Sequence, residues 1–424
     1  MKRIVLFFCA ISVVLTALPS CSNNDDNGGE MRYMLPETRA IDLTDSQKSL
    51  VAKNNDFSFN LVRKIHDVRS ESVDAGKSMF VSPLSVTYML GMLNSGANDA
   101  GQQKITEVLG MSGTTARQLN EFCLQLMTQA PNVDKQVTLA TANAIYTNKQ
   151  YELSDSYSAD MKTYYSADAK TLDFASSKAL ATINDWAKEH TNGMIPNVLK
   201  QLNAEAAMYL LSSIYFEATW TKQFDKALTT KETFTAEDGM QAKVSMMHNK
   251  ALVLAYQNAT FRSVRLPYGG GRWSMYIMLP EEGKTVSDVL NCLNADFWST
   301  RNAQYKSATM ELALPKFSIA DITDLRKPLT EMGLASLFST GNAVFDNMCK
   351  DKCLAVGEMF QNSRIDVDEE GSKMTAVTVS GMIDSSVGPD MFDEGKLTAN
   401  RPFVFVVTED TSNAVFFVGT YTGR

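Results

Sequence analysis

Residues 365–380 read IDVDEEGSKMTAVTVS, and this stretch carries the most information about the fold of the chain. An acidic start passes through Gly371 into small and β-branched residues, and no proline occurs from Gly371 to Val387. Such a segment can become the interior of a β-strand, because proline would remove a donor from the ladder and β-branched side chains suit a pleated surface. The composition therefore predicts a segment that can convert from loop to strand.

Strand side chains alternate between two faces, which divides this segment into two sets. The first set contains Ser372, Met374, Ala376, Thr378, Ser380 and Met382. The second set contains Lys373, Thr375, Val377, Val379 and Gly381. The single charge of the two sets, on Lys373, belongs to the second. If the first set faces a core, no charged side chain is buried before Asp384, as a conditional strand requires.

The rest of the chain favours an α+β class, because helix-like and strand-like stretches alternate without a repeating βαβ rhythm. Helical spacing occurs over residues 56–68. A second helix begins at Ser82-Pro83, since serine is a good N-cap and proline fits the first turn. A third covers residues 179–189, with Gly193 as its stop. The predicted strands are 138–146, 208–216, 253–256, 273–279, 310–314 and a C-terminal hairpin of 403–408 and 414–418.

Composition fits a soluble globular protein with a sizeable core. The 424 residues are 44% hydrophobic and 21% charged, with a formal net charge of −8. Basic residues form no block beyond Lys2-Arg3, which argues against nucleic acid as a partner, because phosphate binding needs clustered Lys and Arg.

The first twenty residues have the pattern of a signal peptide. Lys2 and Arg3 precede an apolar run over residues 4–18, which is too short to span a bilayer comfortably. Leu18-Pro19-Ser20-Cys21 resembles a bacterial lipobox, so we expect lipidation at Cys21. A plain signal peptide cut near Ser20 is the alternative.

Residues 21–45 are expected to form a flexible tether and residues 46–424 one folded domain. This arrangement predicts an exported lipoprotein on the outer membrane or cell surface of a bacterium, which contacts the membrane through its lipid alone. A secreted or periplasmic protein is the alternative.

Little in the sequence indicates catalysis, a cofactor or a metal site. Only three histidines occur, and the patterns Gly-x-Ser-x-Gly, Cys-x-x-Cys and His-Glu-x-x-His are absent. We therefore expect that the protein is not an enzyme and that it binds neither a cofactor nor a metal. The cysteines after Cys21 are Cys123, Cys292, Cys349 and Cys353, of which the last two either form a local bridge or stay reduced.

A series of short motifs then follows one order along the chain. The series is Phe80-Val81-Ser82-Pro83-Leu84-Ser85, Gly96-Ala97, Asn143-Ala144-Ile145-Tyr146, Ile183-Asn184-Asp185-Trp186, Thr191-Asn192-Gly193-Met194-Ile195, Ile214-Tyr215-Phe216 with Trp220 and Phe224, Leu266-Pro267-Tyr268, Ser274-Met275, Leu279-Pro280, Leu314-Pro315-Lys316-Phe317, 329–338, 365–372 and Asn400-Arg401-Pro402-Phe403. Together they resemble the serpin family of serine protease inhibitors, over nearly the whole body of the chain.

The resemblance implies the serpin fold, with three β-sheets, about eight or nine helices and an exposed reactive-centre loop between a hinge and Asn400. It also implies a mechanism. A serine or cysteine endopeptidase cleaves the loop, forms an acyl-enzyme and is trapped when the freed hinge side inserts into the main sheet. We expect a monomer whose partner is the target endopeptidase. The implied hinge residues are Glu369, Glu370, Gly371, Ser372, Lys373, Met374, Thr375, Ala376, Val377 and Thr378.

Two counts place the bond that the peptidase cuts. Counting forward from Gly371 gives Ser385-Ser386, which we favour because insertion fixes the length on the hinge side. Counting back from Asn400 gives Met391-Phe392. Small or apolar residues near either bond favour an elastase-like, subtilisin-like or chymotrypsin-like target over a trypsin-like one.

The resemblance also implies a region where the main sheet parts, formed by Ser82, Ser85, Ser212, Trp220 and Gln361. The family usually has asparagine and histidine at the positions of Ser212 and Gln361. Both replacements can hydrogen-bond, so a substitute network with Ser82 is expected. The alternative function is a binding protein that keeps the serpin fold without inserting its loop. Met374 favours this alternative, because a small residue is usual at that inward position.

Overall fold

A computed structural model describes residues 37–190, 198–339, 344–349, 354–372 and 395–424, which belong to one compact unit. The predicted signal peptide and Cys21 lie outside these residues. Before the first helix, Thr38 already pairs with Asp134, and Ile41 and Leu43 are buried. The residues that pack on the body therefore begin before the boundary predicted at residue 46.

The described residues contain nine α-helices. They are α1 (Asp45–Ser70), α2 (Pro83–Gly96), α3 (Asp99–Val108), α4 (Ala116–Gln129), α5 (Asp155–Tyr165), α6 (Ser177–His190), α7 (Val286–Cys292), α8 (Ala295–Gln304) and α9 (Arg326–Leu329). The predicted start of α2 is confirmed, because the Ser82 hydroxyl accepts the Ser85 N–H and Pro83 occupies the first turn. Residues 330–338, after α9, form short helical turns and not an α-helix, since Gly333 has a φ of 108° that no α-helix allows.

The strands of the described residues fall partly between these helices and partly in consecutive runs, β4 to β8 and β11 to β15. They are β1 (Met79–Val81), β2 (Val137–Asn148), β3 (Asp168–Leu172), β4 (Met208–Thr219), β5 (Thr230–Thr235), β6 (Gln241–Gln257), β7 (Phe261–Tyr268), β8 (Trp273–Pro280), β9 (Lys306–Pro315), β10 (Phe317–Asp324), β11 (Glu358–Val367), β12 (Gly371–Ser372), β13 (Lys396–Thr398), β14 (Phe403–Glu409) and β15 (Ala414–Tyr421).

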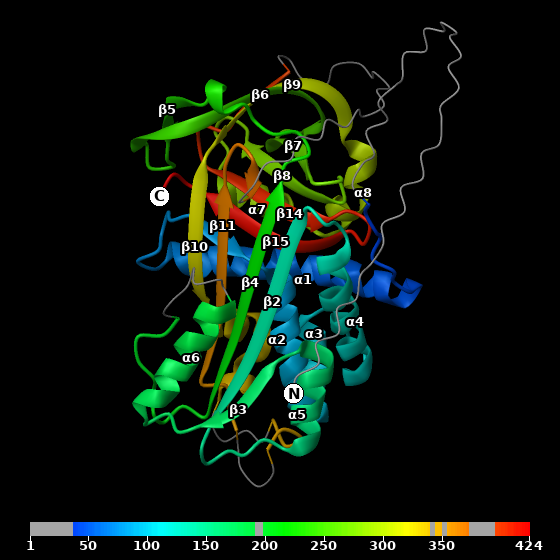
Figure 1. The fold of residues 1–424 in the computed structure, drawn as a ribbon, viewed down its shortest axis with the longest axis vertical. Helices are drawn as coiled ribbons and strands as arrows, with labels where there is room; N and C mark the ends of the chain where they lie inside the picture. The colour runs from blue at the N-terminus through cyan, green and yellow to red at the C-terminus, as the bar shows by residue number, and fades with distance from the viewer. Residues whose placement is uncertain (1–36, 191–197, 340–343, 350–353, 373–394) are drawn as a thin grey trace, which may run out of the picture. The chain divides into compact units, whose positions relative to one another are not determined.

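One sheet has six strands in the order β10-β11-β4-β2-β3, with β12 added against β4. Helix α6 covers one face of β2 and β4 and shares a small apolar cluster with them (Figure 1). The opposite face of these strands belongs to the main core, which also contains α1 and α2. Any further strand of this sheet would place the side chains of one face against this core.

The other sheet has nine strands in the order β1-β15-β14-β8-β7-β6-β9-β13, with β5 added against β6. The described strands thus form two hydrogen-bonded sheets where three were expected. The physical reason is the 17-residue strand β6, which pairs with β5 over residues 241–246, with β9 over residues 246–255 and with β7 over residues 254–257. Two of the expected sheets are therefore joined into one through this strand.

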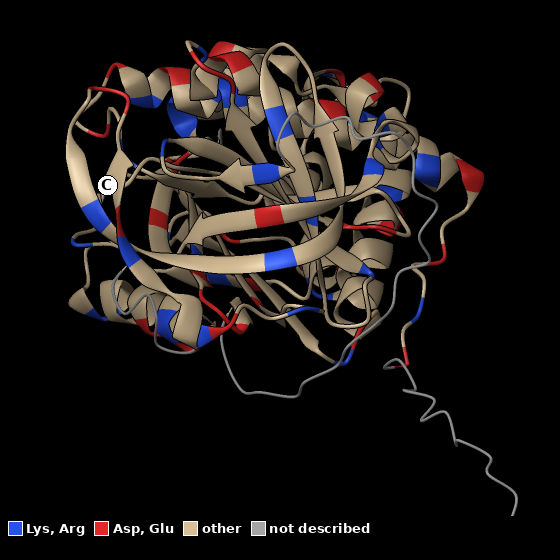
Figure 2. Cartoon of the chain, turned by 90° about the horizontal axis from the view of Figure 1, so that it is seen from above, with Lys and Arg blue, Asp and Glu red and all other residues tan. Residues whose placement is uncertain are grey.

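The α+β class is confirmed by this arrangement of helices around two mostly antiparallel sheets. Figure 2 shows acidic and basic residues interspersed over the outer elements. None of the described helices combines the length and the apolar character needed to cross a membrane.

Candidate functional site

The hinge lies at the end of the six-stranded sheet where β4 finishes and β11 turns. Strand β11 runs parallel to β4, with pairs from Glu358 and Tyr209 to Arg364 and Tyr215. We call this pairing the β4–β11 seam. After a turn at residues 368–370, β12 runs back antiparallel to β4, with Gly371 opposite Thr219 and Ser372 opposite Ala218. The chain thus re-enters the sheet at the end of β4, next to the last residue pairs of the seam.

The turn before β12 is closed by Asp368. Its Oδ1 accepts the N–H groups of Glu370 (2.9 Å) and Gly371 (3.2 Å), and its own N–H donates to the Gly371 carbonyl (2.8 Å). Gly371 has a φ of 150°, and a Cβ there would lie 2.1 Å from the Ala218 carbonyl oxygen. Only glycine lets the chain approach β4 this closely.

Trp220 holds the turn from the β4 side. Its indole N–H donates to the Asp368 carbonyl (2.9 Å) and its backbone N–H to the Glu370 carbonyl (2.8 Å). The indole stacks on Tyr268 with ring centroids 4.3 Å apart and an angle of 10°. Two backbone carbonyls of the hinge are therefore fixed by one buried aromatic residue.

Glu369 makes a buried polar contact at the hinge. Its carboxylate accepts hydrogen bonds from Lys316 Nζ (3.0 Å) and Thr229 Oγ1 (2.9 Å), and its side chain is 7% exposed. Burial is the largest influence on the pKa of Glu369 and favours the neutral form. The hydrogen bonds from Lys316, from the Glu369 backbone and from Thr229, together with the charge of Lys316, outweigh it and hold the pKa below the usual glutamate value. Glu370 forms a second ion pair with Lys226, nearer to solvent.

Ser372 shows which face the hinge presents to the core. Its side chain is fully buried, and its Oγ lies 2.9 Å from the Tyr268 hydroxyl. Ala218, its partner on β4, belongs to the main core. Ser372 therefore points into the core, as expected for the first of the two sets.

Beneath the seam, Gln361 of β11 joins the sheet to the start of α2. Its side-chain carbonyl accepts the Ser82 N–H (2.8 Å), and its amide N–H₂ donates to the Ser82 carbonyl (2.6 Å) and to Ser85 Oγ (2.5 Å). All three residues are fully buried. The expected contact between Gln361 and Ser82 is present.

Ser212 does not complete that network. Ser212, on β4, lies opposite Gln361 of β11 and opposite Asn143 of β2. Its buried hydroxyl has no hydrogen-bond partner in the described residues. The reason is that the side-chain amide of Gln361 makes its hydrogen bonds with Ser82 and Ser85 instead. Ser213 and the Asn362 side chain, one pair further along the seam, also lack partners within the described part of the chain. The middle of the seam is therefore polar on both faces and poorly satisfied.

The structure brings together Glu369, Glu370, Gly371, Ser372 and Trp220 at the turn, and Ser82, Ser85 and Gln361 beneath the seam. The other predicted residues of the loop lie outside the described residues: Lys373, Met374, Thr375, Ala376, Val377 and Thr378 of the hinge, and the candidate bonds Ser385-Ser386 and Met391-Phe392.

Sequence reasoning missed the roles of Lys316, Thr229 and Tyr268 in holding the hinge. Lys316 and Tyr268 lie within motifs that carried the family resemblance, but nothing in the sequence pairs them with residues 53 and 104 positions away. Thr229 had no signal at all.

The described residues contain no cluster of His, Cys, Asp and Glu that could hold a metal ion. Cys123 is buried and reduced, and burial raises its pKa to about 12, so it is not a nucleophile. Cys292 is also reduced. Cys349 is buried, and Cys353 lies outside the described residues.

Comparison with known proteins agrees with this geometry. The sequence model of the serpin family, described as serine protease inhibitor, matches residues 52–423. The chain belongs to the serpin family.

Curated relatives of this serpin include proteins with two kinds of name. It is 28% identical to the plasma serine protease inhibitor of Homo sapiens, over 87% of this chain and 88% of that protein. It is 27% identical to the corticosteroid-binding globulin of Pongo abelii, over 89% of this chain and 91% of that protein. The relatives of this chain therefore include a protease inhibitor and a binding protein.

Among solved structures, the thermophilic serpin tengpin in its native state has a TM-score of 0.79 and 25% identity, and the match covers 93% of this chain and 98% of that one. The expected serpin fold is thereby confirmed for this chain.

Proposed function

We propose that this serpin inhibits a serine-type endopeptidase by cleavage of its loop and insertion of the hinge side into the six-stranded sheet. The observation that supports the proposal most directly is β12, which runs antiparallel to β4 from the first hinge residues. A strand continued along this path would have to enter between β4 and β11.

The register of β12 fixes how that strand would meet β4. Because Gly371 pairs with Thr219 and Ser372 with Ala218, each further residue moves one position back along β4. Thr378 would then face Ser212, and Met382 would face Met208, the first residue of β4.

The faces also match under this register, since directly opposite residues of an antiparallel pair point to the same side. The β4 partners of the first set belong to the main core, apart from Ser212: Met208, Leu210, Ile214, Phe216 and Ala218. Lys373, of the second set, would face Glu217 on the other side of the sheet. The inserted strand would thus bury no charge and would supply a hydroxyl, from Thr378, to the unpartnered Ser212.

The length of β4 supports one of the two candidate bonds. Its 12 residues would pair with residues 371–382, which leaves Ser385-Ser386 just beyond the end of the new strand. Inserting this length moves an attached enzyme by about 40 Å, at roughly 3.3 Å per residue. Displacement on this scale would distort the oxyanion site of the peptidase and leave the ester with the Ser385 carbonyl unhydrolysed.

The test is incubation of the purified protein with an elastase-like, a subtilisin-like and a chymotrypsin-like peptidase, followed by denaturing electrophoresis and mass measurement. We expect a denaturation-resistant complex with at least one of them and release of a fragment that begins at Ser386. A peptidase whose catalytic serine has been replaced is the control, because it can bind but cannot form the ester. Cleavage by all three without any complex would contradict the proposal.

The second candidate is a binding protein that keeps the serpin fold, and Met374 favours it. In the register above, Met374 would face Phe216 in the core, where two large side chains must fit together. Replacement by alanine separates the two functions. If Met374→Ala converts a cleaved substrate into a complex-forming inhibitor, the loop can insert and Met374 is what prevents it.

We also propose that the protein is exported and held on the bacterial surface by lipid on Cys21, which supports a target peptidase outside the cell. Metabolic labelling with a fatty acid should mark the wild-type protein and not Cys21→Ser. Equal labelling of the two would reject the anchor, and release of unlabelled protein into the medium would favour the plain signal peptide.

A further inference from the structure

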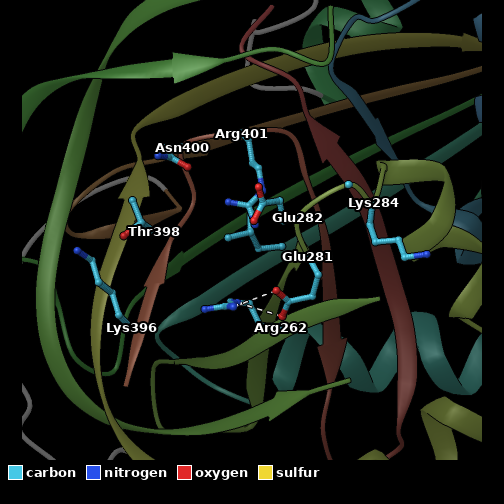
Figure 3. A pocket seen from close by; sticks show the side chains of 10 residues that line it. Arg262, Glu281, Glu282, Lys284, Lys396, Thr398, Asn400 and Arg401 are labelled. Atoms are coloured by element: carbon cyan, nitrogen blue, oxygen red, sulfur yellow. Dashed lines mark hydrogen bonds and ion pairs between the residues drawn. The ribbon is translucent and has the colours of Figure 1, made fainter. Parts of the chain in front are cut away.

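A cavity of about 530 Å³ lies at the nine-stranded sheet, and none of its lining residues belongs to the hinge. Its walls come from the start of β7, the end of β8 with the turn that follows, strand β13 and the residues just before β14 (Figure 3). The volume is in the range of pockets that hold small organic ligands. The loop-insertion function assigns no role to this cavity.

The charged groups that line the cavity are unbalanced. Arg262, Lys284, Lys396 and Arg401 carry four positive charges, and Glu281 and Glu282 carry two negative charges. Glu281 is already engaged, because it accepts hydrogen bonds from Arg262 (3.2 and 2.9 Å) and from Gln257 (3.0 Å). The surplus of two positive charges is therefore not neutralised within the cavity wall.

The guanidinium of Arg401 is only partly satisfied. One terminal nitrogen donates to the Pro280 carbonyl (2.5 Å), while its buried Nε has no partner in the described residues. Burial lowers the pKa of Arg401, the charge of Arg262 lowers it further, and Glu281 and Glu282 act in the opposite direction. Arg262 is already paired with Glu281, so Glu282 is the remaining carboxylate of the cavity wall that can offset the charge of Arg401.

The cavity walls are held by backbone pairing rather than by loose loops. Arg262 and Leu279 are directly paired between β7 and β8, and the Glu281 N–H donates to the Thr260 carbonyl (2.8 Å). On the other side, the Asn400 carbonyl accepts the Thr235 N–H (2.9 Å). A site built on paired strands needs little rearrangement to receive a ligand.

We propose that this cavity binds a small organic molecule that carries a carboxylate or phosphate group. Guanidinium groups recognise both groups through paired, charge-assisted hydrogen bonds, and Arg401, whose Nε has no partner in the described residues, offers such donors. Arg262, already bonded to Glu281, adds positive charge to the same space. Glu282 competes with the ligand for these cations, so it limits the affinity. The proposal is independent of whether the loop inserts.

The test is calorimetric titration of the full chain in a low-salt buffer free of phosphate and carboxylates. Citrate serves as the carboxylate probe, glucose 6-phosphate as the phosphate probe and glucose as the uncharged control. We expect citrate or glucose 6-phosphate to bind with a dissociation constant of about 1 mM or tighter, and glucose not to bind. The probe that binds more tightly identifies the group that the natural ligand carries.

Three variants tie binding to this cavity. Arg401→Gln should weaken binding about tenfold or more, because it removes a charged donor. Glu282→Gln should tighten binding several-fold, since it removes the competing carboxylate, and a gain of affinity cannot result from misfolding. Lys104→Gln on α3 removes one surface charge that does not line the cavity, and it should leave binding unchanged.

The proposal fails if neither charged probe binds the wild-type protein at this level. It also fails if Glu282→Gln does not tighten binding, or if Lys104→Gln weakens binding as much as Arg401→Gln does. Should Arg401→Gln prove unstable, the comparison of Glu282→Gln with the wild type decides the matter alone.

Discussion

At the scale of single residues, the buried hydroxyl of Ser212 lowers the stability of the closed sheet. It has no hydrogen-bond partner in the described residues, and an unsatisfied buried polar group costs about 1–3 kcal/mol. We expect Ser212→Ala to raise the free energy of unfolding of the uncleaved protein by about 1 kcal/mol. Urea denaturation followed by tryptophan fluorescence measures this change.

Ser85→Ala is the matched control, because it removes a hydroxyl from the same buried region that does accept a bond from Gln361. That variant should lose about 1 kcal/mol instead. If both substitutions destabilise the protein equally, the Ser212 hydroxyl has a partner and the seam is better satisfied than its contacts indicate.

Glu369 makes the hinge sensitive to acid. Its pKa in the folded protein lies below the usual value, so the unfolded chain takes up the proton first, and the ion pair with Lys316 stabilises the fold only above that range. The contribution should be complete above the pKa of glutamate in the unfolded chain, at about pH 5 and higher, and should disappear as the pH falls through the lower pKa of the folded protein.

The measurement compares the melting temperatures of the wild type and Glu369→Gln from neutral to acidic pH. At neutral pH the wild type should be more stable by about 1 kcal/mol, a modest value because Lys316 is half-exposed. The difference should vanish in acid. A difference that stays constant with pH would mean that Thr229, rather than the ion pair, supplies the effect.

At the scale of elements, the register of β12 predicts opposite results for two threonines of the hinge. Under that register Thr378 faces Ser212 in the core, whereas Thr375 faces Tyr215 on the outer side, next to Glu217. Thr378→Arg would bury an unpaired charge on insertion, at a cost of several kcal/mol, and should lower the yield of peptidase complex about tenfold or more. Thr375→Arg should leave the yield nearly unchanged.

Both variants should be cut by the peptidase at the same rate, since neither residue lies at the candidate bond. Densitometry of complex and cleaved product on one gel measures the partition. Equal loss of complex in the two variants would show that the inserted strand does not follow the register of β12.

The same elements show what sequence could and could not predict. Strands β2, β4, β8, β14 and β15 were predicted because apolar and β-branched residues dominate each of them, with at most two adjacent polar residues inside the predicted range. Strand β11 was not predicted from periodicity, because Gln361, Asn362 and Ser363 lie in its middle and normally indicate a loop. These residues are buried because they face α2, β1 and β4, which only the folded chain brings together.

The site divides in the same way. The hinge motif and Gln361 were found through resemblance to a family, and the contact of Gln361 with Ser82 followed from it. The pairing of Glu369 with Lys316, and the cavity around Arg401, depend on residues far apart in the sequence. No local pattern carries the distance between such residues, so they needed the structure.

At the scale of the whole molecule, the six-stranded sheet is held in an incomplete state. Its central seam leaves Ser212, Ser213 and Asn362 without partners among the described residues, while a segment of matching length and polarity follows directly after β12. A strand of about ten further residues would add ladder hydrogen bonds on both sides, each worth about 1 kcal/mol net. Under the proposed mechanism, cleavage of the loop would remove the tether that prevents this insertion.

We therefore expect cleavage between Ser385 and Ser386 to raise the melting temperature of the protein by about 10 °C or more, although it breaks a covalent bond. The measurement is calorimetry of intact protein and of protein nicked by a peptidase present in trace amounts. Thr378→Arg is the control, because it is nicked at the same bond but cannot insert, so its melting temperature should not rise. A wild type that melts no higher after nicking would mean that β12 marks the end of a fixed strand and that the loop does not enter the sheet.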